Sequence, residues 1–571
     1  MNRWRLAAAA FLLLAVAVPL ALPYLDLLHS PVAWRAWAEW PRILQLARNT
    51  LLLVGGTLLL ALPLGVAGAV LLYRTDLPGR KALRFLAVLT LFVPLPLFAS
   101  GWEAALGSGG WLPVAVWNRL APNDPDLLPG GRLWKPWGQG LDAAIWVHAM
   151  AAIPWVIVLV GQGLCWVDRE LEEDALTAAG PWRVLSRVTL RRGLVAVVAA
   201  ALWVALQTAT DVTVTDVMQV RTFAEEVYTQ MVRPEPDPTA PTTQAVVARA
   251  VAVSLPAVML TGLLVVAAVQ WWERRLPPLA TLSAPPRPFR LGRARAPLLV
   301  LMLALLGVLA GVPLASLVWK TGLGGSPAHW DPAVAWSHLA GAVRVRSRLV
   351  VGNLVQALLT GAVIGLLGLV VSWLAVGCRA FRLGVLLLMA AAWATPGPVI
   401  GIGLKDTFLL LMDWTHSRWV ADVLYYGPSP VPVCWAWLVR LFPFAVALLW
   451  PVVRLLPPEL RDAARVDGAT PGQEFRLVVW PLCGLAWFRS AWAVAVLALG
   501  ELSASKLAET PGSSTFAHGI FDQMHYGVTN DVAAHCLVLL AFVTVGAAVV
   551  VGSGRVAARG GTAGAAAESG L

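Results

Sequence analysis

Two polar stretches of the chain combine residue types that could form a docking surface for another protein. Residues 168–190 read DRELEEDALTAAGPWRVLSRVTL, and residues 458–481 read PELRDAARVDGATPGQEFRLVVWP. Each begins acidic and helix-forming, reaches a small residue or glycine, and then becomes basic and apolar. Because acidic residues favour a helix N-terminus and glycine favours its end, we expect a short helix, a break and a second amphipathic helix in each stretch. The alternative is a pair of ordinary amphipathic loops. These stretches are called the first loop and the second loop below.

Carboxylates near the ends of apolar segments form a second group of candidates. Asp211 and Glu501 each lie 33 residues after a small residue of the preceding loop, Ala178 and Gly468 respectively. A carboxylate at such a position is costly and is by default a functional candidate. Hard cations prefer oxygen ligands, so these acids, with nearby Asp216, could line a path for Fe3+ or its chelate. The alternative is that they lie at the membrane interface, solvated or capping a helix.

Enzymatic chemistry has little support in the sequence. No GxxxxGK[ST] pattern occurs, so the chain has no phosphate-binding loop for ATP. Neither a metal triad, a nucleophile elbow nor paired catalytic acids are present, and we expect no cofactor. His518 and His525 could line an iron path, with interfacial histidines as the alternative. The five cysteines have no metal-ligand spacing and are interpreted as small core residues without a disulfide.

The elements that must position these residues are membrane helices. The 571 residues are 58% hydrophobic and 13% charged, with a mean hydropathy of +0.71, whereas a soluble domain is about 25% charged. Apolar segments of roughly 20 residues, enough to cross a bilayer, recur about 12 times. Their backbone groups must be satisfied internally, so we expect an all-α polytopic membrane protein. The segments are 6–24, 51–72, 84–104, 145–165, 193–209, 250–269, 297–318, 354–375, 383–404, 432–453, 482–502 and 533–551.

The distribution of charge predicts the topology. The net charge of +11 could suggest nucleic acid, but more than half of the 43 Lys and Arg fall on the side of the membrane that holds both termini. The positive-inside rule makes that side cytoplasmic. The 29 Trp residues suit anchoring at the interface. The basic N-terminus followed by residues 6–20 could be a signal peptide, but it lacks a clear cleavage pattern, so we expect an uncleaved first helix.

The chain reads as two tandem halves. Residues 273–296, rich in Pro and Arg, nearly bisect it and suggest a cytoplasmic linker between halves at 1–272 and 297–552, followed by a tail at 553–571. Residues 222–231 read TFAEEVYTQM and residues 515–524 read TFAHGIFDQM, identical at five of ten positions. In the same order, Asn49 matches Asn353, and the PLP at 94–96 matches the PGP at 396–398. This ordered set indicates a parallel duplication, an architecture that transporters use.

The second loop resembles the EAA loop of ABC importer permeases. It carries an acidic residue and two alanines, then a glycine after three intervening residues, and a Val-x-Trp-Pro stretch ending at Pro481. The matching residues are Asp462, Ala463, Ala464 and Gly468. The first loop is a degenerate copy with two possible registers. Pairing Val188 with Val478 places Glu172, Glu173, Asp174 and Ala178 at the motif positions, whereas keeping Gly180 as the loop glycine requires a slip of two residues.

The resemblance implies a fold and a set of partners. The fold would be two six-helix MetI-like permease halves, and each loop would carry a coupling helix that docks on a separate ATPase, expected as a homodimer. A periplasmic binding protein would deliver the substrate, and the membrane would be the bacterial inner membrane. The stretches 499–505, 511–517 and 524–527 resemble ferric-iron permeases, as do residues 210–216 and 74–80 in the first half, although thiamine, phosphonate and polyamine permeases share this plan.

Two rival interpretations remain. Residues 76–81, DLPGRK, resemble a loop of the major facilitator family, which would make the chain a 12-helix secondary transporter. That motif explains one loop, whereas the EAA resemblance explains two. The other rival is a membrane enzyme without a recognisable catalytic constellation.

Overall fold

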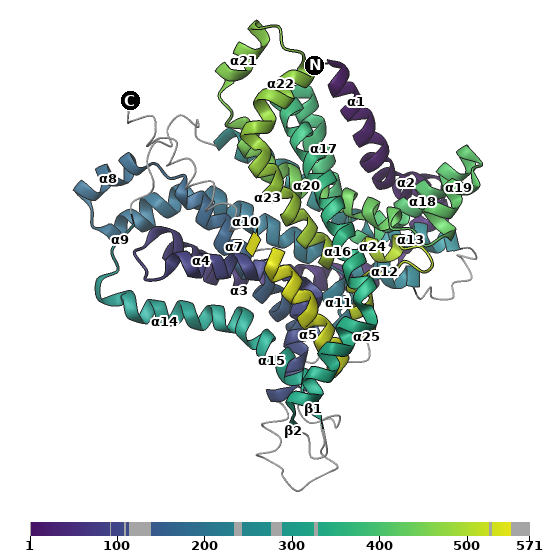
Figure 1. The fold of residues 1–571 in the computed structure, drawn as a ribbon, viewed down its shortest axis with the longest axis horizontal. Coiled ribbons are helices and arrows are strands. Elements are labelled where there is room, and N and C mark those ends of the chain that lie inside the picture. The colour runs from purple at the N-terminus through teal and green to yellow at the C-terminus, as the bar shows by residue number, and fades with distance from the viewer. Residues whose placement is uncertain are drawn as a thin grey trace. The chain divides into compact units, whose positions relative to one another are not determined.

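The computed structural model shows an all-α membrane protein (Figure 1). The structure describes residues 2–91, 93–107, 110–112, 139–232, 243–275, 288–324, 329–524, 528–546 and 548–549. Among these, nine helices are long and apolar enough to cross a membrane, or up to 11 if each of two bent pairs is one span. A shorter apolar helix occupies Asn530–Gly546. The finer prediction of about 12 crossings stays a prediction, because this count covers only the described residues.

The helices of the first half follow the predicted segments. They are α1 (Asn2–Leu12), α2 (Val18–His29), α3 (Trp40–Arg74), α4 (Arg80–Leu91), α5 (Leu95–Leu106), α7 (Leu141–Cys165), α8 (Arg169–Ala178), α9 (Pro181–Val184), α10 (Leu190–Thr210), α11 (Thr213–Val217), α12 (Phe223–Val232) and α13 (Thr243–Arg275). A 3₁₀ segment at Pro31–Ala38 precedes α3. Single π-helical turns join α1 to α2 and α9 to α10.

The second half repeats this order. Its helices are α14 (Arg295–Leu306), α15 (Val312–Thr321), α16 (Pro332–Val376), α17 (Arg379–Ala394), α18 (Gly397–Thr415), α19 (Arg418–Ala421), α20 (Val431–Arg454), α21 (Pro458–Val466), α22 (Pro471–Glu474), α23 (Trp480–Gly500), α24 (Ser505–Ala508) and α25 (Phe516–Met524). A short 3₁₀ turn at Gly292–Ala294 precedes α14. Strands β1 (Leu323–Gly324) and β2 (His329–Trp330) form one antiparallel pair. Further π-helical turns occupy Gly307–Gly311, Asp422–Tyr426 and Phe475–Val479.

The third predicted segment of each half is a bent pair of helices. The axes of α4 and α5 differ by 98°, and those of α17 and α18 by 111°. Both bends fall where the paired prolines begin, with Pro94 and Pro396 each preceding the second helix as its N-cap. Proline restricts the residue before it and lacks a donor, so a helix ends there rather than continuing. The sequence therefore located both segments but not their bends.

The described residues form two compact units, and each unit combines both sequence halves. One unit holds the described residues of 1–29, 347–518 and 541–549, and the other holds those of 30–346 and 519–540. In the first unit α2 packs on α18, and in the second α15 packs on α5. The first helices of the two halves are thus exchanged. The predicted boundary at 273–296 marks the duplication in the sequence but not the edge of a compact unit.

A repeated four-residue sequence accounts for this exchange. Residues 18–21 and 312–315 both read VPLA, and each lies just after a π-helical turn. A Cβ added at Gly403 would lie 1.8 Å from the carbonyl oxygen of Pro19, and one at Gly101 would lie 2.6 Å from Cβ of Pro313. Only glycine permits such an approach. The same contact thus forms once in each unit, between equivalent positions of the two halves.

The end of the linker is fixed to the connection between α3 and α4. Residues 276–287 of the predicted linker lie outside the described residues, as does the predicted tail. Phe289 pairs in parallel with Thr75, its N–H donating to the carbonyl of Arg74 at 2.7 Å. The carboxylate of Asp76 accepts from the N–H of Leu291 at 2.9 Å and pairs with Arg295. The hydrogen bond from Arg295 holds the pKa of Asp76 below its ordinary value.

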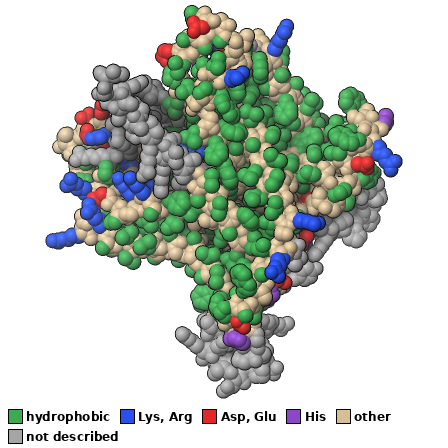
Figure 2. Space-filling model, in the orientation of Figure 1, with side chains coloured by type: hydrophobic (Ala, Val, Ile, Leu, Met, Phe, Trp, Pro, Cys, Tyr) green, Lys and Arg blue, Asp and Glu red, His purple; other side chains and the backbone are tan. Residues whose placement is uncertain are grey.

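The surface agrees with a membrane protein. Hydrophobic side chains cover most of the face in Figure 2, and Lys and Arg gather at its edges near α8 and α9. Large apolar side chains on the long helices are exposed, among them Leu51 and Leu59 of α3 and Val300 of α14. Exposed apolar surface of this extent requires a lipid environment.

Candidate functional site

The first loop contains a short helix that ends without a glycine turn. The carboxylate of Asp168 caps α8 by accepting from the N–H of Glu170 at 3.0 Å. The helix ends at Ala178, Ala179 is extended, and Gly180 caps α9 with φ of −66°. Of the two residues that the alternative registers offered at this position, Ala178 is the one that ends the helix. Gly180 precedes the second helix in a conformation that any residue can adopt, because Pro181 opens that helix.

The second loop contains the predicted helix and glycine turn. Helix α21 ends at Val466, and Gly468 follows in the left-handed region with φ of +79°. Thr470 and Gln473 then form a reciprocal capping box, in which the N–H of Thr470 donates to Oε1 of Gln473 at 2.8 Å. Only glycine adopts this φ at little cost, so the loop turns sharply here before α22 begins.

The spacing between corresponding residues of the two loops divides between the two predicted registers. Pro181 and Pro471, Leu190 and Trp480, and Asp211 and Glu501 are each 290 residues apart, as Val188 and Val478 are. The last residues of α8 and α21, Ala178 and Val466, are 288 apart. The re-entering helices thus follow one predicted register and the ends of the short helices follow the other. The difference is a turn two residues longer in the second loop.

A buried ion pair holds the short helix of the first loop to a membrane helix. Glu172 of α8 is 2% exposed and pairs with Arg74, the last residue of α3, which is fully buried. Its other carboxylate oxygen accepts from Oγ1 of Thr189 at 2.6 Å, just before α10. Arg74 also donates to the carbonyl of Leu164 in α7 at 3.1 Å. This Glu172 cluster therefore joins α8 to the ends of three membrane helices.

The second loop has a cluster with the charges reversed. Here the short helix supplies the cation, Arg461 of α21, whose Nε donates to Glu474 at 2.8 Å. Glu474 ends α22, is 2% exposed, and also accepts from Nε1 of Trp373 in α16 at 3.1 Å. Arg465 approaches Glu474 at 3.4 Å from the solvent side. This Glu474 cluster joins α21 to α22 and to α16, although its residues do not match those of the Glu172 cluster.

The remaining predicted residues of the loops leave an outward face open. Of the first loop, Glu173 is half-buried and pairs with Arg169 at 2.8 Å, while Asp174, Ala178 and Gly180 are exposed. Of the second loop, Asp462, Ala463 and Gly468 are exposed and Ala464 is half-buried. Val466 is 87% exposed at the end of α21. Each short helix thus has one buried side chain as an anchor and a free surface on the other side.

Asp211 and Glu501 are helix caps. The carboxylate of Asp211 accepts from the N–H of Val214 at 2.9 Å, and that of Glu501 accepts from Ala504 and Ser505 at 2.9 and 3.1 Å. Both follow helices of 21 residues that begin at the loops, so they lie about 30 Å from them. The capping alternative is therefore the observed arrangement.

The surroundings of the three path candidates differ. Asp211 is 5% exposed and lies 3.5 Å from Nε2 of His148 in α7, Asp216 is half-buried in α11, and Glu501 is half-buried before α24. Among the described residues, no three His, Cys, Asp or Glu side chains gather closely enough to hold a metal ion. Asp211 and Glu501 are therefore accounted for by the short helices that they cap.

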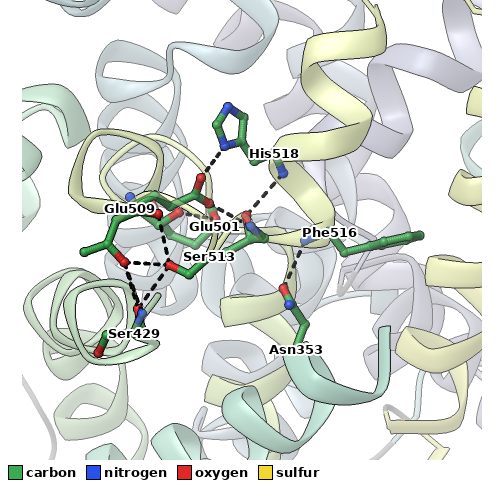
Figure 3. Close-up of polar contacts among 10 residues, drawn as sticks. Asn353, Ser429, Glu501, Glu509, Ser513, Phe516 and His518 are labelled. Atoms are coloured by element: carbon green, nitrogen blue, oxygen red, sulfur yellow. Dashed lines mark hydrogen bonds and ion pairs between the residues drawn. The ribbon is translucent and has the colours of Figure 1, made fainter. Parts of the chain in front are cut away.

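A polar network fixes the segment that follows Glu501 (Figure 3). Glu509 accepts from the N–H of Thr515 at 2.8 Å and pairs with His518. The side chain of Ser513 donates to the carbonyl of Ser429 at 3.1 Å. These contacts give His518 a structural partner, whereas His525 lies outside the described residues.

The starts of α25 and α12 are each joined to a membrane helix by a hydrogen bond of an asparagine side chain to the backbone. Asn353 of α16 accepts from the N–H of Phe516 at 3.0 Å, and Asn49 of α3 donates to the carbonyl of Arg221 at 2.9 Å. In each half the predicted asparagine thus bonds to the backbone within two residues of the start of the Thr-Phe-Ala segment.

Neither the scan against protein-family models nor the search of curated proteins found a match for this chain. The geometry of the loops therefore carries the functional argument. Sequence reasoning missed Arg74, Arg461, Glu474 and Trp373 as part of the site. There was little sign of these residues in the sequence, because each binds a partner that is distant along the chain. Only their proximity in the folded structure shows that they belong to the site.

Proposed function

We propose that this chain is the transmembrane permease of an ATP-driven importer, with both membrane halves in one polypeptide. The observation that carries the proposal is the pair of short helices α8 and α21. Each lies between two long helices at an equivalent place in the duplication, offers an exposed face, and is fixed by a buried ion cluster to the ends of membrane helices. A surface that is exposed on one side and rigidly joined on the other suits the transmission of force.

Transport would be powered by a separate ABC-type ATPase. The ATPase would be a homodimer in which each subunit binds one short helix of this chain. The sequence has no phosphate-binding loop of its own, which supports this division of labour. We place the chain in the bacterial inner membrane, with both termini and both loops in the cytoplasm, on the basis of the positive-inside pattern. A periplasmic binding protein would deliver the substrate to the opposite side.

The proposed substrate is ferric iron, and the argument for it is the resemblance of residues 499–527 to ferric-iron permeases. The acids that could have lined a cation path, Asp211 and Glu501, cap short helices, so they add little to this choice. Transport of thiamine, a phosphonate or a polyamine by the same machinery is the alternative that a substrate screen must separate.

The facilitator interpretation loses its main support, because the acid of its motif has a structural partner. Asp76 accepts from Leu291 and pairs with Arg295, so it anchors the end of the linker to the connection between α3 and α4. A loop that fastens two parts of the chain gives Asp76 a structural role without an ion-driven transport cycle.

Reconstitution with the partner ATPase tests the proposal. The purified chain should transport nothing down an ion gradient by itself, and it should co-purify with a nucleotide-binding subunit. Transport by the chain alone would refute the proposal. So would the failure of every candidate ATPase to bind the chain when the two are co-expressed.

The two glycines of the loops give a matched pair of variants for the coupling step. No atom of this chain lies within 4 Å of a Cβ added at Gly468 or Gly180, so the two sites differ in backbone conformation and not in the space around the Cβ. Gly468→Val opposes a positive φ and should lower the substrate transported per ATP, whereas Gly180→Val should not. Equal effects would remove the role assigned to the second loop.

A further inference from the structure

We infer that each loop is held in its docking position by the chain that enters the other sequence half. Residues just before α14 position the first loop, and residues at the start of α1 position the second. This inference rests on the proposed function, because it assigns a positioning role in the coupling of the same two loops. Phe289 and Trp4 are the residues that carry it.

Phe289 is inserted into the first loop. It is 7% exposed and packs with Val184 and Leu185, against Ala175 and Leu176 of α8. Its backbone is fixed by the parallel pairing with Thr75, so the ring cannot leave without breaking two hydrogen bonds. The end of the linker is therefore part of the first loop's packing, although it is separated from that loop by about 100 residues of sequence.

The ring also touches the arginine that anchors the loop. The guanidinium carbon of Arg74 lies 5.7 Å from the centroid of Phe289, within the range of a cation–π contact. Arg74 in turn pairs with Glu172 of α8. The contacts therefore run from the linker, through the end of α3, to the short helix.

Trp4 makes the corresponding contact at the second loop. Its ring meets Trp373 edge to face, with centroids 6.3 Å apart, and the next residue, Arg5, donates to the carbonyl of Leu374 at 3.3 Å. Trp373 donates to Glu474, which binds Arg461 of α21. Here the contacts run from the start of α1, through the end of α16, to the short helix.

The two paths have the same order of parts but different residues. At the first loop, Phe289 contacts Arg74 at the end of α3, and Arg74 binds Glu172. At the second loop, Trp4 contacts Trp373 near the end of α16, and Trp373 binds Glu474. Hydrophobic packing alone would not require these three parts to be in contact at both loops. The three parts are a buried carboxylate, the end of a long helix and the chain that enters the other half. The arrangement means that displacement of either short helix acts on helices from both sequence halves.

Hydrogen exchange on the purified full-length chain tests the anchoring without any ATPase. Phe289→Ala should speed exchange in residues 168–190 by about 10- to 100-fold and leave 458–481 unchanged. Trp4→Ala should do the reverse by at most about 10-fold, because Trp4 is 47% exposed. The conservative variants Phe289→Leu and Trp4→Phe should restore most of the protection. Leu301→Ala, at an exposed position of α14, is the control and should change neither loop.

Two results would overturn the inference. One is loosening of both loops, or of neither, by Phe289→Ala. If that variant does not fold, Asp76→Asn weakens the attachment of the same linker segment from outside the core. Faster exchange limited to residues 168–190 is again the expected result.

The other is an unchanged ratio of substrate moved to ATP hydrolysed when the Phe289→Ala chain is assembled with its ATPase. An ATPase that fails to bind the unaltered chain refutes the proposed function instead, and the exchange experiment still decides whether the anchoring exists.

Discussion

Replacing Glu474 by glutamine should open the second loop while the membrane helices stay folded. The carboxylate is 2% exposed and accepts from Arg461 at 2.8 Å and from Trp373 at 3.1 Å. Arg461 is itself buried, with a side chain 7% exposed, so water cannot replace the lost partner. Removal of one member of a buried pair costs about 3–5 kcal/mol, because the other charge remains buried without compensation.

Hydrogen exchange of residues 458–481 measures this loss directly. Since every 1.4 kcal/mol is a factor of about ten, local opening should become roughly 100- to 4,000-fold more frequent. Arg465 touches the same carboxylate, but its side chain is 47% exposed, so Arg465→Ala should cost at most about 1 kcal/mol and serves as the matched control.

A double variant separates the charge from the packing. Replacement of a buried ion pair by apolar residues is often close to neutral, so Arg461→Leu combined with Glu474→Leu should recover much of the protection that Glu474→Gln removes. The reasoning is refuted if Glu474→Gln and Arg465→Ala have equal effects, or if the double variant is no better protected than the single one.

Three further predictions concern the rest of the fold. Burial raises the pKa of Glu225 from its ordinary 4.5 to about 7, so the folded chain holds a proton that the unfolded chain releases in this interval. Thermal stability should therefore fall as the pH rises from 4.5 to 7, and Glu225→Gln should remove that slope; an identical slope in both proteins would contradict this. Gly403→Ala should lower the unfolding midpoint by the equivalent of about 1–3 kcal/mol, because its Cβ meets the backbone of the first helix, whereas Gly55→Ala, with open space, should not lower it; equal shifts would count against the close contact. Asn353→Ala should cost about 1–3 kcal/mol by leaving a buried N–H unpaired and should speed exchange at the start of α25, and Asn353→Asp should restore protection; no change in exchange would show that the bond is not formed.

The sequence was sufficient for the features that depend on short stretches of chain. Apolar runs predicted the membrane helices, and the acidic start of each loop predicted the short helices α8 and α21. The glycine turn predicted at Gly468 is present, and the conformation there demands glycine. In the first loop the sequence left Ala178 and Gly180 open, and the helix ends at Ala178. For Asp211 and Glu501 the sequence left two roles open, lining a cation path or capping a helix, and both residues cap helices in the structure.

Only the tertiary structure decided how these pieces are joined. Equivalent loops bury opposite charges on their short helices, Glu172 in one and Arg461 in the other, although both loops begin with similar acidic sequences. The repeated VPLA is visible in the sequence, but its partner glycines are not.

The physical reason is the range of the forces involved. Helix periodicity and capping act over a few residues, so the sequence displays them directly. The burial of a charge or an aromatic ring depends on which distant segment fills the space beside it. Phe289 packs with Val184 and Leu185 and pairs with Thr75, and nothing in the local pattern of either segment records that the other will be there.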